Sequence, residues 1–155
     1  MHESFTVRPA LEADFADWLP LWHGYNQFYG RAGATALAEN ITRTTWSRFM
    51  DPEEPMHALV AECPDGLLGL AHFLYHRSTI QSGNSCYLQD LYTVEAARGR
   101  GVARALIQEV YRRAAEQGSP RVYWQTHESN TVAMKLYDKV AEKSGFVVYR
   151  KLLGI

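Results

Sequence analysis

Residues 87–114 change their pattern of apolar side chains partway, and this change constrains the fold more than any other part of the sequence. The first part is apolar and aromatic, as in a buried strand, and it leads to the sequence RGRG at residues 98–101, the glycine loop. Beyond the glycine loop, apolar residues recur at three- and four-residue steps, the spacing of an amphipathic helix. The pattern predicts a strand, a tight turn and a helix over about residues 101–117.

The glycine loop favours an anion at the start of this helix. Glycines at positions 99 and 101 let the backbone come close to a ligand. The first N–H groups of a helix have no partner within it, and the helix dipole adds partial positive charge there. With the side chains of Arg98 and Arg100, these groups predict a phosphate-binding loop. A loop that only turned the chain would use the glycines but would not need the arginines.

Two common phosphate motifs do not fit the glycine loop. A nucleotide P-loop requires G-x-x-x-x-G-K-[ST], and neither that spacing nor the Lys-Ser/Thr pair is present. A dinucleotide fingerprint requires a third glycine three positions after Gly101, where Arg104 stands. The loop therefore belongs to another class of phosphate binder.

Composition narrows the class of protein. The chain has 155 residues, 46% hydrophobic and 21% charged, which predicts one globular domain over residues 1–155. A net charge of −1 argues against a nucleic-acid partner. Cys63 and Cys86 lie outside any Cys/His cluster, which predicts two buried thiols and no metal site. With no long apolar run and no signal peptide, we expect a cytoplasmic protein without a membrane partner.

The whole chain predicts an α+β fold, with a mixed, mostly antiparallel sheet of about six to seven strands and helices on both faces. The three strands before the glycine loop form an antiparallel meander, and the helix after it should make its flanking strands parallel neighbours. Expected strands cover residues 5–8, 57–62, 67–75, 87–94, 121–126 and 146–153, and expected helices cover residues 15–29, 34–50, 101–117 and 129–145.

The glycine loop also matches a family pattern, because Arg98, Gly101 and Ala103 occupy the defined positions of [Q/R]-x-x-G-x-[G/A]. This pattern resembles the acetyl-CoA motif of the GCN5-related N-acetyltransferases (the GNAT family). The resemblance implies that the loop amides hold the pyrophosphate of acetyl-CoA and that the edge of the preceding strand holds its pantetheine arm. The implied cofactor-binding residues are Leu91, Tyr92, Thr93, Arg98, Gly99, Arg100, Gly101, Val102, Ala103 and Arg104.

A second match lies downstream. The sequence N-x-x-A-x-x-L-Y at residues 130–137, followed by G-F at residues 145–146, is similar to the family's N-x-x-A-x-x-[FL]-Y … G-F signature. By this resemblance Asn130 contacts the cofactor arm and Tyr137 protonates the departing thiolate, a step for which a phenol is a competent acid. The alternative for Tyr137 is a core aromatic on an amphipathic helix. The G-F pair comes about four residues later than usual, which predicts one more helical turn and an unmoved Tyr137.

The attacking amine must lose a proton, and the acidic residues nearest the expected cofactor are Asp90 and Glu128. Each is a candidate base, directly or through water, and each is alternatively a group that only attracts a cationic substrate. The strand LQDLYTV and the ending GFVVYRK look like the fungal histone/polyamine acetyltransferase-like branch and its bacterial relatives. Diamine acetyltransferases have Glu where Gln89 stands, and glutamine cannot act as a base. His72 is assigned no role.

The far end of the first expected helix mixes aromatic and amide side chains more than a core requires. Although most of its apolar stripe is core, Tyr25, Asn26 and Tyr29 are candidates for the acceptor site, together with Gln89. The sequence thus predicts an acetyl-CoA-dependent N-acetyltransferase acting by direct attack of a primary amine of a small molecule, such as a polyamine or amino acid. The alternatives are a protein or histone lysine acetyltransferase and a non-catalytic acyl-CoA-binding sensor. Exposed aromatics and a C-terminal strand favour a homodimer.

Overall fold

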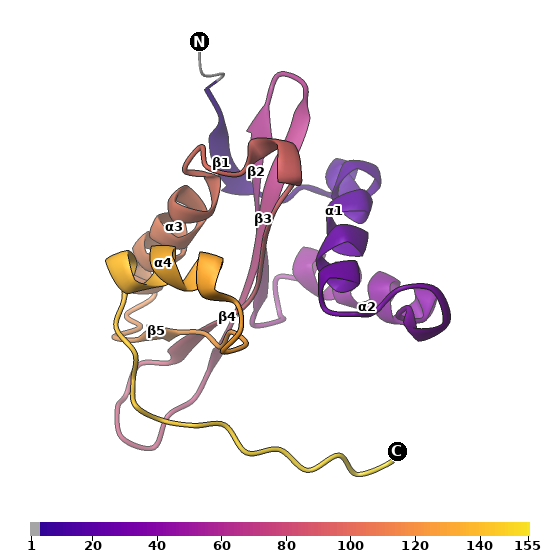
Figure 1. Ribbon diagram of the computed structural model, residues 1–155. Coiled ribbons are helices and arrows are strands. Elements are labelled where there is room, and N and C mark those ends of the chain that lie inside the picture. The colour runs from indigo at the N-terminus through magenta and orange to yellow at the C-terminus, as the bar shows by residue number, and fades with distance from the viewer. Residues whose placement is uncertain (1–3) are drawn as a thin grey trace. The chain divides into compact units, whose positions relative to one another are not determined.

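The structure is a computed structural model that describes residues 4–155. The chain divides into two compact units, Met1–Gln125 and Thr126–Ile155. The first unit holds a β-sheet with three α-helices, and the second holds one α-helix followed by a segment without helix or strand (Figure 1). Across the described residues, the helices are too short or too polar to cross a bilayer.

A five-stranded sheet organises the first unit, in the order β1-β2-β3-β4-β5. Its first four strands pair antiparallel, and β5 pairs parallel to β4. The predicted meander and parallel crossover are therefore confirmed, whereas the sheet has five strands among residues 4–155 instead of six or seven. The strands are β1 (Thr6–Pro9), β2 (Met56–Cys63), β3 (Gly66–His76), β4 (Ser85–Thr93) and β5 (Val122–Tyr123).

Helices cover both faces of this sheet, as predicted. Helices α1 (Phe15–Phe28) and α2 (Glu39–Met50) lie on one face, and α3 (Val102–Glu116) lies on the other (Figure 1). The helix expected over residues 34–50 starts later than predicted, because residues 33–35 form a separate 3-10 turn. The apolar row of α3 is buried as its spacing predicts, and the free thiols of Cys63 and Cys86 are buried too.

Tryptophans form the centre of the core under α1 and α2. Trp18 is fully buried, its ring centroid lies 5.6 Å from that of Trp22 in a stacked pair, and it lies 4.7 Å from that of Trp46 on α2. Such contacts between large rings bury much apolar area and fix the two helices against the sheet. The aromatic stripe of α1 is thus largely core, as its periodicity predicts.

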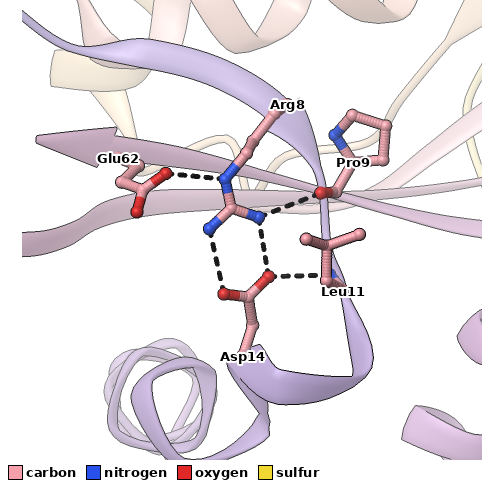
Figure 2. A network of polar contacts seen from close by, with 5 residues as sticks. All are labelled: Arg8, Pro9, Leu11, Asp14 and Glu62. Atoms are coloured by element: carbon pink, nitrogen blue, oxygen red, sulfur yellow. Dashed lines mark hydrogen bonds and ion pairs between the residues drawn. The ribbon is translucent and has the colours of Figure 1, made fainter.

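Arg8 on β1 ties the first strand to its neighbours (Figure 2). Its guanidinium donates two parallel hydrogen bonds to Asp14, with Nη1–Oδ2 at 2.7 Å and Nη2–Oδ1 at 2.9 Å, and its Nε donates to Glu62 on β2 at 2.6 Å. Asp14 also accepts the backbone N–H of Leu11. The hydrogen bonds from Arg8 hold the pKa of Asp14 below its usual range. This network anchors the start of α1 to the edge of the sheet.

The second unit departs from the sequence prediction. Helix α4 (Thr131–Val140) ends five residues before Gly145, so the late G-F pair does not lengthen it, and the strand expected over residues 146–153 is absent. A strand requires a neighbouring strand for its backbone hydrogen bonds, and no strand pairs with residues 146–153. Large apolar side chains there are consequently exposed, with Phe146 at 88% and Tyr149 at 93%.

Candidate active site

Strand β4 carries a bulge at Gln89. Its register with β3 moves from His72↔Asp90 to Phe73↔Leu88, so Gln89 is an extra residue on β4. A bulge disrupts the ladder locally and redirects the side chains beside it. Asp90 is buried, at 8% exposure, whereas Gln89 is exposed.

Beyond the bulge, β4 has an open edge. It pairs with β5 only at Cys86 and Tyr87, so among the described residues no strand covers the outer edge of residues 88–93. An open edge offers N–H and C=O groups to an extended ligand. The predicted pantetheine contacts at residues 91–93 lie on it, and the buried Oγ1 of Thr93 has no hydrogen-bond partner. A bound ligand can satisfy such an orphaned polar atom.

The glycine loop connects this edge to α3. Gly99 (φ 78°) and Gly101 (φ 81°) both have left-handed backbones, and α3 begins at the next residue, Val102. The space where each glycine would carry a Cβ is open, so the backbone is accessible there. Arg98 donates from Nε to the carbonyl oxygen of Thr93 at 3.3 Å, which holds its side chain beside the strand end. Free amides of the first helical turn next to arginine make an anion site.

A buried chain of hydrogen bonds ends at Asp90. The indole Nε1–H of Trp18 donates to Nε2 of His72 at 3.0 Å, and Nδ1 of His72 lies 2.8 Å from Oδ2 of Asp90. Because an indole only donates, Nε2 of His72 must carry a lone pair, which puts the proton of the neutral ring on Nδ1. His72, itself 2% exposed, therefore donates to Asp90. This role was not predicted, because nothing in the sequence pattern shows which way a strand histidine points.

Tyrosines from the end of α1 complete this region. The hydroxyl of Tyr25 lies 3.4 Å from the carbonyl oxygen of Gln89, and the rings of Tyr25 and Tyr29 have centroids 5.0 Å apart. Burial raises the pKa of both phenols, and the Asp90 carboxylate raises it further. The structure thus brings together the predicted residues Tyr25, Tyr29, Gln89 and Asp90. We call Trp18, Tyr25, Tyr29, His72 and Asp90 the Asp90 cluster.

Two residues that were predicted to contact ligands have side chains that pack inside the protein. The side chain of Tyr92 packs against the α1 side of the core, where Gly24 on α1 leaves room for its phenol, and its carbonyl oxygen lies beside Gly69 of β3. Asn26 is 3% exposed, and its amide donates to the carbonyl oxygen of Trp22 at 2.9 Å. Its Oδ1 accepts a hydrogen bond from Arg31, which was not among the predicted site residues.

The second unit holds the other predicted residues. Asn130 precedes α4 and donates from its amide to Oγ1 of Thr126 at 3.1 Å. Tyr137 is half-buried on α4, and Glu128 is exposed. The roles assigned to these three residues stay predictions. Within residues 4–155, no cluster of three or more His, Cys, Asp or Glu side chains is arranged to hold a metal ion.

Comparison with known proteins gives consistent matches. Residues 16–141 match the sequence model of the acetyltransferase (GNAT) family. The D-amino-acid N-acetyltransferase HPA3 of Saccharomyces cerevisiae is 36% identical over 154 residues, covering 97% of this chain and 92% of the yeast protein. A solved structure of a probable acetyltransferase has a TM-score of 0.82 at 23% identity, covering 97% and 99% of the two chains. An aminoglycoside N-acetyltransferase solved with CoA has a TM-score of 0.77 at 17% identity, covering 99% and 97%.

Proposed function

Because the chain belongs to the GNAT family and is an N-acetyltransferase, we propose that it moves the acetyl group of acetyl-CoA to a primary amine of a small molecule. The observation that carries this proposal is a buried carboxylate, Asp90, at the bulge of an open-edged strand that leads into the glycine loop at the start of α3. The yeast relative's name, a D-amino-acid N-acetyltransferase, supports a small-molecule acceptor. The family match spans both units, which supports one catalytic domain over residues 1–155.

Acetyl-CoA supplies the acetyl group as a thioester. The glycine loop binds its pyrophosphate through the amides at the start of α3 and through the side chains of Arg98, Arg100 and Arg104. The open edge at residues 91–93 binds the pantetheine arm by backbone hydrogen bonds, as an added strand would. The family resemblance assigns Asn130 to the same arm. Holding the thioester and the amine in line removes much of the entropic barrier to reaction.

On the acceptor side, Asp90 takes the proton that the amine loses, directly or through water. The nitrogen then forms its bond to the acetyl carbon, and the bond between that carbon and sulfur breaks. Tyr137 gives its hydroxyl proton to the departing thiolate. Glu128 is the second candidate base, and it differs from Asp90 in being exposed. The acceptor site is lined by Tyr25, Tyr29 and Gln89. The buried Asn26 contributes to the same site through its hydrogen bond with Arg31.

A thiol-release assay with acetyl-CoA and a panel of amines tests this function. We expect turnover with small primary amines, strongly reduced in Asp90→Asn and reduced in Tyr137→Phe. Tight CoA binding without turnover on any amine would identify the sensor alternative. Mass spectrometry that finds acetylated peptides but no acetylated small amines would identify the protein lysine acetyltransferase alternative.

We also infer a homodimer. Support comes from the exposed apolar side chains of the C-terminal segment, Phe146, Val147, Val148, Tyr149, Leu152 and Leu153. A second copy is a suitable partner for such a surface. Light scattering should find a dimer for the full chain and a monomer for a chain ending at residue 145, and a monomeric full chain would contradict the inference. The cytoplasmic location and the lack of nucleic-acid and membrane partners stay predictions from composition.

A further inference from the structure

We infer that Arg31 binds the carboxylate of the acceptor, so that the small-molecule amine is an amino acid and not a polyamine or another amine without an acid group. The inference rests on the proposed function, because it names the substrate class of the same site. It depends on where Arg31 lies, on what holds its side chain and on which charges surround it.

The backbone at the end of α1 fixes the position of Arg31. Gly30 has a left-handed backbone (φ 79°), and its N–H donates to the carbonyl oxygen of Gln27 at 3.0 Å. The N–H of Arg31 donates to the carbonyl oxygen of Asn26 at 2.8 Å. These two bonds form a Schellman motif, which closes a helix and turns the chain back along it. Arg31 is therefore directed back over the last turn of α1, where Tyr25 and Tyr29 lie.

Neighbouring side chains hold the guanidinium in one orientation. Its Nε donates to Oδ1 of Asn26 at 2.6 Å, and the amide of Asn26 is itself fixed by a bond to the carbonyl oxygen of Trp22. The guanidinium carbon lies 5.7 Å from the ring centroid of Tyr25 and 5.5 Å from that of Tyr29. A stacked arginine bonded through Nε keeps its terminal nitrogens for a planar anion, which a carboxylate matches in pairs.

Arg31 also lacks an acidic partner within the described part of the chain. Arg8, Arg43, Arg112 and Arg113 each form an ion pair with Asp or Glu. Arg31 is half-buried, and its recorded partners are an amide and two tyrosine rings. A partly buried guanidinium gains most from an anion when no protein carboxylate neutralises it. The position therefore suits an anionic group of a ligand.

A negative group stands near the same tyrosines. Tyr25 contacts the backbone of Gln89, the residue before Asp90. Burial raises the pKa of Tyr25 and Tyr29, the Asp90 carboxylate raises it further, and the Arg31 guanidinium opposes the rise. The two phenols thus lie within reach of one negative and one positive side chain. An amino acid presents its ammonium and its carboxylate to such a pair, whereas a diamine would bring a second cation towards Arg31 and be disfavoured.

A purely structural role for Arg31 makes different predictions. A cation at the C-terminus of a helix stabilises the helix dipole, whatever the substrate. Loss of such a cation would lower the melting temperature and would affect all acceptors alike. The comparison that decides is therefore between acceptors that differ only in the carboxylate.

The experiment uses alanine, serine and phenylalanine, each as the free amino acid and as its uncharged amide, in both configurations. We expect Arg31→Gln to raise the KM of accepted amino acids by about tenfold to a hundredfold. The KM of the amides should change less than about threefold, since they offer no charge for a charge-assisted bond. Arg43→Gln is the matched control, because Arg43 stacks on Phe15 at 5.5 Å and pairs with Glu39 on α2.

Several outcomes overturn the inference and leave the proposed function in place. These are an equal effect of Arg31→Gln on acids and amides, no effect on either, or a wild-type preference for spermidine over every amino acid. A wild-type enzyme that acetylates no amine refutes the proposed function itself. If Arg31→Gln does not fold by circular dichroism, Arg31→Lys decides, because it keeps the helix-end charge but loses the planar fork. A KM increase confined to amino acids then supports the inference, and its absence overturns it.

Discussion

Asp90 and the glycine loop follow one another closely along the chain, yet the glycine loop and the Asp90 cluster are built in opposite ways. The glycine loop draws on four successive residues and on backbone groups at the start of α3. The Asp90 cluster draws on side chains from α1, β3 and β4, and its Trp18–His72 hydrogen bond joins residues 54 positions apart. A site made of local backbone depends on backbone conformation alone, whereas a site made of distant side chains depends on packing. Mutations should therefore separate the two.

Asp90→Asn should have the largest effect. The amide still accepts the hydrogen bond of His72 but cannot take a proton, so kcat should fall by about a hundredfold to ten-thousandfold, the usual range for loss of a general base. The KM of acetyl-CoA should stay unchanged, since the glycine loop is untouched. Steady-state kinetics with both substrates varied will measure this. A fall of less than threefold, with a large fall in Glu128→Gln, would transfer the role of base to Glu128.

His72→Phe should come next. Phenylalanine fits among the rings around His72 but donates no hydrogen bond, so the Asp90 carboxylate loses a buried donor. We expect the free energy of unfolding to fall by about 1.5–3 kcal/mol, and kcat to fall about tenfold as the carboxylate loses its orientation. Urea unfolding and kinetics measure the two effects. Lost stability with an unchanged kcat would show that His72 only supports the core.

Gly101→Ala tests the glycine loop with a smaller expected effect. A left-handed alanine costs about 1–2 kcal/mol, and relief of that strain would move the loop amides, so the KM of acetyl-CoA should rise about fivefold to tenfold. Gly118→Ala is the matched control, because Gly118 is also left-handed (φ 74°) with open space around it and follows the other end of α3. Equal KM values in the two variants would argue against the loop as the cofactor site.

Asp14→Asn should change neither site and should affect stability alone. Arg8 holds the pKa of Asp14 below its ordinary 3.8, so the ionised carboxylate stabilises the fold above about pH 4. That contribution is lost as the pH falls through the lowered pKa. The variant should be about 1–3 kcal/mol less stable at pH 7, and its difference from wild type should shrink towards pH 2. Urea unfolding across this range measures it, and a difference independent of pH would contradict the mechanism.

Patterns along the chain predicted the elements more reliably than their ends. The meander, the crossover and the helix after the glycine loop follow from apolar spacing, which is a local property. The predictions of a strand over residues 146–153 and of a helix beyond Val140 were wrong. An apolar segment forms a strand only where a partner strand supplies hydrogen bonds. Residue spacing carries no information about that partner.

The site divides in the same way. The sequence alone identified the family and pointed to the glycine loop, because left-handed turns and helix starts depend on the residues that form them. Only the tertiary structure decided what Asp90 touches. Leu88 and Asp90 would share a face in a regular strand, but the bulge pairs them with Phe73 and His72, which point to opposite faces. The return of Arg31 over two tyrosines is local by contrast, because the Schellman motif with left-handed Gly30 directs it. Contacts between distant segments arise only when the chain folds, and the proposed acceptor site depends on them.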